Sequence, residues 1–538
     1  MRLSHGTGPA VSQAPRLPTV GAARAVSPWA TLAVLCASLL IVNLDTTVLN
    51  VALPALVRDL GATSSQLQWV VDAYALVFGG LLLVSGSLAD RFGRKRTFLL
   101  GLVAFAAGSA WAAFSGTVTV LVMARASMGV GASLLMPSTL SIITNVFPNP
   151  AQRQRAIAIW AGTSGVGFGV GPMIGGLLLA HFWWGSVFLI NVPIATGAAL
   201  LALRLVPDSK NPAAPRPDLV GALLSVAGLA LVLWAVIEAP VEGWSSALVL
   251  GPGAGGVAVL VAFATWERSS SHPMLNLMLF RARGFSVAVC SVGLVMFGLL
   301  GALFMLTQFL QFDLGYSALQ SGERMLPMAA AMALAPLSAV FNRLAGSKIT
   351  TGAGMFLCAL GLWMISRTQV AWGYGHMLPG IMMIGFGVAL VMPSVSASVM
   401  SSVPSGDTGI GSATNGTFIQ VGGAMGVAVI GSLLSSRYKS RMTTGIAPLH
   451  LPPAVAHVVL GSIGGAISVT RQVPAPVGHL LLRAARSAFI SGVDLGLLPA
   501  AAMVLAGCLL VLGALPARPH RSAGQVTVGT ELVPEHRP

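Results

Sequence analysis

The segment that decides the fold is Ile41-Val-Asn-Leu-Asp45-Thr-Thr-Val-Leu-Asn50-Val-Ala-Leu-Pro54, which lies late in an apolar run that begins near Pro28. At about 1.5 Å per residue, this run is long enough to cross the roughly 30 Å hydrocarbon core of a bilayer as a helix. Asp45 therefore lies at membrane depth, where a carboxylate is costly unless it faces a bundle interior or a wet cavity. Two interpretations stay open: Asp45 is neutralised by a hydrogen bond inside the bundle, or it binds and releases a proton.

The composition indicates a polytopic membrane protein. Of the 538 residues, 55% are hydrophobic and only 8% are charged, and the mean hydropathy is +0.83. A net charge of +15 would suggest nucleic acid as a partner of a soluble protein, but here the cations cluster between apolar spans and mark topology. All four cysteines fall inside apolar segments, so we expect neither a disulfide framework nor a Cys-x-x-Cys metal site.

The apolar spans predict an all-α protein with fourteen transmembrane helices. They lie near 29–55, 67–89, 97–115, 118–146, 155–180, 184–205, 219–238, 247–266, 285–311, 321–343, 348–366, 375–402, 409–435 and 488–514. This pattern divides the chain into a cytoplasmic tail (1–28), an N-terminal six-helix half (29–205), a linker with an inserted helix pair (206–283), a C-terminal six-helix half (284–515) and a second cytoplasmic tail (516–538). The first tail has no cleavage site after a short apolar core, so we expect no removable signal peptide.

Positive charge in the short loops places both termini in the cytoplasm, with one exception. The long connection 436–487 carries six cations but falls on the outer side of the membrane in this count. Either it is an outer loop with amphipathic pieces on the surface, such as 480–488, or it hides a further span such as 455–469. We keep fourteen spans.

A second stretch, Gly86-Ser-Leu-Ala-Asp90-Arg91-Phe-Gly93-Arg94-Lys95-Arg96, forms a tight inner loop between the second and third spans. Its glycines allow a sharp turn and close helix approach. Asp90 can meet the positive N-terminus of another helix, while Arg91 and Arg94 can pair with acids or anionic headgroups. Taken alone, the cluster is equally well explained as a topology anchor.

The spacing of this loop resembles the signature loop of the major facilitator superfamily. Together with the first span, the chain looks like the fourteen-helix drug:proton antiporter branch. Three further pieces agree in order and position: Arg125 with Gly129 and Gly131 in the fourth span, Gly167-x-x-x-Gly171-Pro172-x-x-Gly175-Gly176 in the fifth, and Phe188-Leu-Ile-Asn191-Val-Pro193 in the sixth. The resemblance extends from about residue 29 to 515.

The fifth span combines close packing with a bend. Gly167, Gly171 and Gly175 fall on one stripe at which another helix can approach closely, and Pro172 removes a backbone hydrogen bond. This alone describes an ordinary packing face. The resemblance adds that Gly171, Pro172 and Gly175 shape the interface between the halves and prevent proton leakage, and that the Gly86–Arg94 loop gates the conformational change. In that role Asp90 would cap the helix that begins after Asp407 in the outward-open state.

Three charged side chains fall at similar depth in the first half. Asp45, Asp72 and Arg125 each lie within roughly 8 to 15 Å of the outer surface when residues are converted to helix rise. A buried guanidinium needs an anion, so we predict that Arg125 faces the first-half cavity near Asp45 or Asp72. A static structural ion pair remains the alternative. A carboxyl that moves between paired and unpaired settings can load and unload a proton, and Asp72 with Asp45 would favour cationic substrates.

In the second half, Gln308 and Gln311 share one face of the ninth span. We predict that they line the central cavity with Asn415 and Gln420 of the thirteenth span, although each amide also suits an interhelical hydrogen bond.

The sequence therefore predicts a monomeric, proton-coupled antiporter in a bacterial inner or plasma membrane. It would export drugs or other hydrophobic or cationic small molecules by alternating access. A first alternative is an exporter dedicated to one endogenous metabolite, such as an antibiotic, a lipid or a siderophore. A second is a membrane enzyme or sensor, against which no metal cluster, Walker loop or nucleophile elbow appears. We expect no cofactor, no metal and no nucleic-acid partner.

Overall fold

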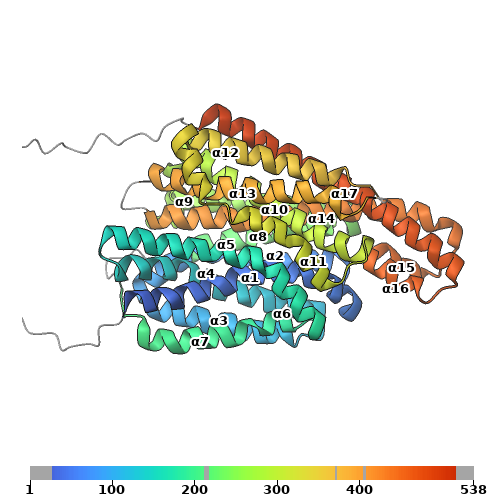
Figure 1. The fold of residues 1–538 in the computed structure, drawn as a ribbon, viewed down its shortest axis with the longest axis horizontal. Helices are drawn as coiled ribbons and strands as arrows, with labels where there is room; N and C mark the ends of the chain where they lie inside the picture. The colour runs from blue at the N-terminus through green and yellow to red at the C-terminus, as the bar shows by residue number, and fades with distance from the viewer. Residues whose placement is uncertain (1–26, 211–216, 370–371, 404–407, 516–538) are drawn as a thin grey trace, which may run out of the picture.

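The computed structural model describes residues 27–210, 217–369, 372–403 and 408–515. The expected cytoplasmic tails lie almost entirely outside these ranges, as does Asp407. Within the described ranges the fold is helical and contains no strand, as Figure 1 shows. The all-α fold class predicted from the apolar spans is confirmed.

The first half consists of six long helical segments. They are α1 (Pro28–Leu60), α2 (Ser64–Phe92), α3 (Arg94–Ala113), α4 (Val118–Val146), α5 (Pro150–His181) and a sixth segment split into α6 (Ser186–Leu189) and α7 (Asn191–Leu205). The inserted pair is α8 (Leu219–Glu242) and α9 (Ala247–Ser269), and the short 3-10 helix η1 (Leu277–Arg281) leads from it into the second half.

The second half is less regular than the first. It contains α10 (Arg283–Gln308), the π-helical turn η2 (Phe309–Asp313), α11 (Ala318–Met332), α12 (Leu337–Ser366), α13 (Tyr374–Ser402), α14 (Thr408–Ile446), the 3-10 turn η3 (Ala447–Leu449), α15 (Pro453–Gly461), α16 (Ile463–Thr470) and α17 (Ala475–Ala514). The last long helices, α14 and α17, extend well beyond the apolar spans at 409–435 and 488–514.

Thirteen helices in the described ranges are individually long and apolar enough to cross a bilayer, and the tenth predicted span explains the difference from fourteen. That span, near 321–343, is broken into α11 and the first turns of α12. Pro336 lies at the break, where its missing N–H interrupts helical hydrogen bonding. Gly346 then separates the two parts of α12 with φ of 82° and ψ of 159°, a conformation that favours glycine. The chain thus turns back inside α12, which supplies parts of two spans.

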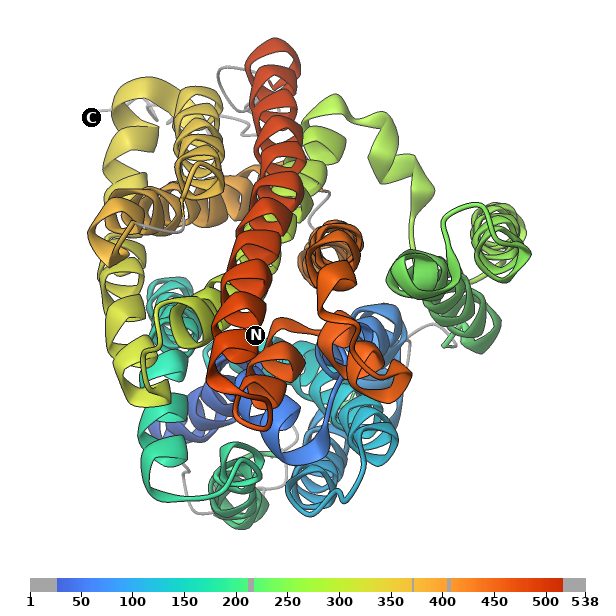
Figure 2. The same ribbon diagram turned by 90° about the vertical axis from the view of Figure 1, so that its right-hand side faces the viewer.

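The two halves lie side by side as separate bundles, and the inserted pair lies at their edge (Figure 2). Two helix pairs, α2 with α14 and α5 with α11, form most of the seam between the halves. α8 packs against both α2 and α14. At this contact Ser225 donates to the Gly80 carbonyl oxygen at 3.4 Å, and a methyl group on Gly80 would overlap the Val226 side chain. The inserted pair therefore covers the seam from outside.

The connection 436–487 is largely helical. Its short helices α15 and α16 form a hairpin between the extended ends of α14 and α17, and neither is long enough to span a membrane (Figure 1). Tyr438 donates to the carbonyl oxygens of Val459 at 3.0 Å and Ser462 at 3.2 Å, which fixes the hairpin to α14. Ser64 donates to the Gly461 carbonyl oxygen at 3.0 Å and joins the hairpin to the start of α2. We call this end of the molecule the hairpin side.

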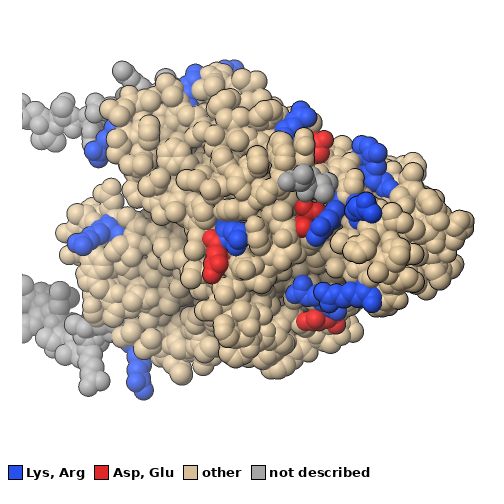
Figure 3. All heavy atoms as spheres, turned by 45° about the vertical axis from the view of Figure 1, so that its right-hand side comes forward, with Lys and Arg blue, Asp and Glu red and all other residues tan. Residues whose placement is uncertain are grey.

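The opposite end, where the described chain begins and ends, is the terminal side. Here the halves separate, and Figure 3 shows a hollow between them at this end. Apolar side chains on the broken tenth span, including Leu337 and Val340, are exposed, and space is open beside Gly162 and Gly165 of α5. The structure is therefore open on the terminal side and closed on the hairpin side.

Candidate functional site

A buried ion pair lies at the centre of the first half. Nη1 of Arg125 in α4 donates to Oδ2 of Asp45 in α1, and each side chain is only 1% exposed. The sequence places both residues at similar depth, and the structure brings them together rather than pairing Arg125 with Asp72. Because two charges are removed from water here, each requires its partner and further polar contacts.

Those further contacts come from three neighbouring helices. Nδ2 of Asn191 in α7 lies 3.2 Å from Oδ1 of Asp45 and 3.4 Å from Oγ of Ser109 in α3. Nε of Arg125 donates to the Val70 carbonyl oxygen in α2 at 3.0 Å, and its guanidinium carbon lies 4.3 Å from the centre of the Tyr74 ring. The pair is thus enclosed by a polar cluster within the first half and does not face lipid.

Sequence reasoning did not assign a site role to Asn191, Ser109 or Tyr74. Asn191 belongs to the sixth-span motif, and its position as a lone amide at the start of a buried apolar segment could have indicated a polar contact inside the bundle. Ser109 and Tyr74 have no such signal, because a serine and a tyrosine inside apolar spans are ordinary core residues.

Asp72 lies apart from this cluster, on the seam between the halves. It is fully buried, and neither carboxylate oxygen has a hydrogen-bond partner among the described residues. Gln68, one turn before it, accepts a hydrogen bond from Ser432 of α14 at 3.1 Å, and Gly79, seven residues after it, packs on Gln420 of α14. Residues at these spacings share one helix face, so Asp72 faces α14.

The glycines of the fifth span pack α5 between the two halves. Gly167, Gly171 and Gly175 face α1, where a methyl group on Gly171 would overlap the Thr47 hydroxyl. Gly169 and Gly176 face α11 instead, where a methyl group on Gly176 would lie 2.6 Å from the Ala318 carbonyl oxygen.

Pro172 belongs to the contact between α5 and α11. Its backbone packs against Gly322 of α11. The part of α5 around Pro172 therefore touches both α1 and the opposite half.

The Gly86–Arg94 loop has the turn and the charge pairing that its sequence suggests. Gly93 joins α2 to α3 with φ of 112°, a conformation that an L-residue adopts only with strain. Nε and Nη2 of Arg94 each lie 2.8 Å from Oδ1 of Asp90, and Arg94 also reaches the Ser141 carbonyl oxygen at 3.4 Å. Arg91 is exposed. In this conformation Asp90 is paired within its own loop.

The four amides of the second half do not form one group. Gln308 donates to its own helix at the Phe304 carbonyl oxygen, and Gln311 of η2 donates across the seam to the Val51 carbonyl oxygen at 2.9 Å. Gln420 lies against Gly79 of α2, and Oδ1 of Asn415 is buried without a partner in the described part of the chain. Gln311 thus joins the two halves, whereas Gln308 and Gln420 are buried in packed surroundings and Asn415 is half-buried.

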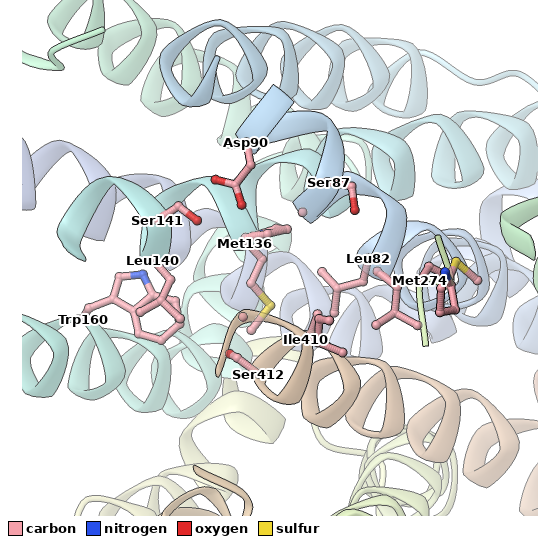
Figure 4. Close-up of a pocket in the computed structure, with 16 residues that line it drawn as sticks. Leu82, Ser87, Asp90, Met136, Leu140, Ser141, Trp160, Met274, Ile410 and Ser412 are labelled. Carbon is pink, nitrogen blue, oxygen red and sulfur yellow. The ribbon is translucent and has the colours of Figure 1, made fainter. Parts of the chain in front are cut away.

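A cavity of about 340 Å³ opens between the halves on the terminal side. It lies between α2, α4 and α5 of the first half and the start of α14 of the second, with Asp90 directed into it (Figure 4). Gly86 also lines it, but Asp45, Arg125 and the four amides do not. Within the described ranges no three His, Cys, Asp or Glu side chains are arranged to hold a metal ion.

Comparison with known proteins identifies the family. The model of the Major Facilitator Superfamily matches residues 35–427, which is most of the chain. The chain belongs to the major facilitator superfamily. The protein is thus a membrane transporter and not an enzyme.

Several curated members of this superfamily are similar over nearly their whole length. The multidrug efflux pump LfrA of Mycolicibacterium smegmatis is 36% identical over 485 residues, covering 90% of this chain and 95% of that protein. The tetracenomycin C resistance and export protein of Streptomyces glaucescens is 32% identical and covers 92% and 93%. The methyl viologen resistance protein SmvA of Salmonella typhimurium is 31% identical and covers 90% and 97%.

Two solved transporter structures share the fold. The human organic anion transporter MFSD10 aligns with a TM-score of 0.56 at 16% identity, covering 90% of this chain and 99% of that one. A bacterial homologue of the human lysosomal transporter Spinster, in an inward-facing and unoccupied conformation, aligns with a TM-score of 0.60 at 16% identity and covers 91% and 98%. At this identity the likeness concerns architecture alone.

Proposed function

We propose that this protein is a proton-coupled antiporter that exports drugs and other hydrophobic or cationic small molecules across the cytoplasmic membrane. The observation that carries the proposal is the buried pair of Asp45 and Arg125, an acid with a counter-charge at membrane depth in a transporter fold. The similar proteins support the substrate class, because their names describe multidrug efflux and resistance to methyl viologen.

The terminal side is the cytoplasmic side in this proposal. The cations of the short loops on that side, such as Arg94, Arg153 and Arg283, satisfy the positive-inside rule. The structure then represents a monomer open to the cytoplasm and closed to the outside by the hairpin side. An exporter collects substrate in this conformation.

Proton coupling arises because Asp45 either pairs with Arg125 as a carboxylate or binds a proton. In this proposal Asp45 is a carboxylate while Arg125 donates to it, and this paired form is the one that has released its proton. When the halves rock and the pair opens, a proton from the outside binds the Asp45 carboxylate and leaves Arg125 with the Val70 carbonyl oxygen and the Tyr74 ring. The substrate leaves to the outside from this protonated form, and return of the empty form to the inward-open conformation restores the ion pair of Asp45 and Arg125 and releases the proton inside.

In this proposal two groups of contacts gate the conformational change, one at the open terminal side of the seam and one where α5 packs between the halves. On the open side, Asp90 holds Arg94 while the start of α14 lines the same cavity, so closure of the cavity would bring Asp90 to that helix N-terminus. On the closed side, the α5 bend at Gly171, Pro172 and Gly175 packs the halves tightly.

Asp72 supplies a second acid for cationic substrates when the seam between α2 and α14 opens to the outside. Gln308, Asn415 and Gln420 would then line the central path. Until that opening, Gln308 and Gln420 are buried and Asn415 is half-buried.

Export of one endogenous metabolite is the second candidate. The observation that favours it is the similarity to the tetracenomycin C resistance and export protein, whose name pairs resistance with export of a single antibiotic. Drug-susceptibility profiling separates the two candidates, because a dedicated exporter protects a host against one compound and a multidrug exporter against several unrelated cations.

The decisive experiment uses everted vesicles energised by respiration, with a fluorescent pH probe inside. An antiporter gives substrate-induced dequenching, because each export cycle moves protons down their gradient. Asp45→Asn is expected to abolish the response. The matched control is Asp59→Asn, which removes an exposed acid near the end of the same helix and should leave the response intact. A normal response in Asp45→Asn would refute the proposed role of Asp45.

A further inference from the structure

The cavity on the terminal side has a wall that comes from the inserted helix pair. Residues 270–276, which we call the strap, connect α9 to η1, and Pro273 and Met274 of the strap line the cavity (Figure 4). The remaining lining comes from α2, α4, α5 and α14. Three parts of the chain therefore meet here: the first half, the second half and the inserted pair.

The strap is held in place by defined contacts. Oε2 of Glu267, a buried residue near the end of α9, accepts a hydrogen bond from the Leu275 backbone N–H at 3.0 Å. Met274 is 5% exposed and packs in one apolar cluster with Leu83 of α2 and Ala222 of α8. The position of Met274 in the cavity wall is thus fixed by the inserted pair and not by either half alone.

The lining suits a lipophilic cation. Apolar side chains dominate it, including the thioethers of Met136 and Met274 and the indole of Trp160. Methionine adapts to ligands of different shape, and an indole face attracts cations. Asp90 is the one charged residue on the lining within the described chain, and both contacts from Arg94 go to its Oδ1. Oδ2 of Asp90 has no described partner, so this oxygen of the ion-paired carboxylate is available to a cation in the cavity.

The size and position of the cavity agree with a ligand site. Its volume of about 340 Å³ is at the lower end of the range for small-molecule pockets. It lies between the halves at the open end, on the path that a substrate from the proposed cytoplasmic side would follow. Neither Asp45 nor Asp72 lines it, so it is distinct from the candidate proton site.

We propose that this cavity is a first binding site for lipophilic monovalent cations, and that Met274 of the strap selects among them. The proposal rests on the proposed function, because it assigns the site to substrates awaiting export. It also gives the inserted pair a role that the two halves cannot supply: placing a selective side chain at the entrance.

The test is equilibrium binding of radiolabelled tetraphenylphosphonium to the purified full-length protein. Met274→Trp fills the cavity and is expected to raise the Kd about tenfold, and Met274→Ala about threefold or more, equivalent to about 1.4 and 0.7 kcal/mol. The matched control is Leu279→Ala, which removes a side chain of similar burial, 7% exposed, just beyond the strap and outside the cavity lining. Its Kd should stay within about twofold of wild type.

Charge selection has its own measurement. Triphenylphosphine oxide is a neutral probe of related shape, and Asp90→Asn should weaken binding of the cation about fivefold or more while leaving that of the neutral probe unchanged. Equal loss for both probes would overturn the assignment to cations. A Kd unchanged in both Met274 variants, or changed as much by Leu279→Ala, would overturn the site.

Failure of this inference and failure of the proposed function give different results. Substrate-induced proton movement combined with Met274-independent binding refutes the entrance site alone. Met274-dependent binding without proton movement for any substrate refutes antiport and leaves the entrance site standing.

Discussion

The pairing of Asp45 with Arg125 can be tested by a double-mutant cycle that separates a coupling element from a static ion pair. Asp45→Asn leaves Arg125 charged and buried, because a guanidinium does not lose its proton in proteins. Removing one partner of a buried pair costs about 3–5 kcal/mol. We expect the lower end of that range here, because Arg125 keeps its bond to the Val70 carbonyl oxygen and its contact with the Tyr74 ring.

The second change, Arg125→Met, removes the remaining charge with a side chain of comparable length. The double variant Asp45→Asn/Arg125→Met should therefore recover to within about 1–2 kcal/mol of wild type. The free energy of unfolding is measured in mixed micelles by tryptophan fluorescence. The control cycle uses Asp90→Asn and Arg94→Met, a pair whose side chains are 34% and 20% exposed, for which the coupling energy should be no more than about 0.5 kcal/mol.

Transport by the same double variant completes the test. If Asp45 carries the proton, the double variant is folded and stable but cannot export substrate in response to a proton gradient. If stability is restored and proton-driven export is also restored, the pair is only structural and the reasoning about coupling is wrong. Additive losses of stability in the double variant would instead show that the two residues do not stabilise one another.

Three further predictions concern the packing and the closed end of the seam. Gly171→Ala should lower the free energy of unfolding by about 1–3 kcal/mol, because its methyl group overlaps the Thr47 hydroxyl. Gly165→Ala is the control and should not lower it, because the space beside Gly165 is open. Thermal unfolding compares the two variants, and equal melting temperatures would contradict the packing. Gly93→Ala should lower the free energy of unfolding by about 1–2 kcal/mol, because alanine is strained at the φ of 112°. The control is Gly116→Ala, where the space is open and φ is not positive, and it should leave the free energy of unfolding almost unchanged in the same measurement. Gln311→Met removes the bond to the Val51 carbonyl oxygen, worth about 1 kcal/mol, and should shift the population about fivefold toward outward-open molecules. Spin labels at the exposed positions Asp59 and Glu323 report this shift as a longer distance, and an unchanged distribution would argue against the role of Gln311 as a closing contact.

Much of the first half could be predicted from sequence because membrane depth follows directly from position in an apolar span. Asp45, Asp72 and Arg125 fall at similar depth on different spans, and a buried guanidinium needs an anion, so a contact between Arg125 and one of the two acids follows from two simple constraints. The choice between Asp45 and Asp72 as the partner did not follow, because helix rotation about its axis is set by packing against neighbours. Asn191 was missed for the same reason, since its direction depends on how α7 packs on α1.

The second half was harder to predict. Apolarity marks the span near 321–343 but not its break at Pro336, which depends on how α11 and α12 pack. The hairpin of α15 and α16 escaped prediction because helices of nine and eight residues in a mixed polar region give no clear periodicity. The amides at 308, 311, 415 and 420 were expected to share a cavity, whereas their spacing fixes only which helix face each occupies.

The most direct test of the central claim is proton release from the purified protein when tetraphenylphosphonium is added in weakly buffered detergent solution, at a pH at which part of the protein holds a proton on Asp45. Substrate binds the inward-open form, in which Asp45 is a carboxylate, and thereby draws the protonated fraction into the deprotonated form. If Asp45 exchanges a proton for substrate, wild type acidifies the solution on substrate addition, Asp59→Asn does the same, and Asp45→Asn gives no acidification while still binding the cation. Acidification of equal size in Asp45→Asn would contradict the account.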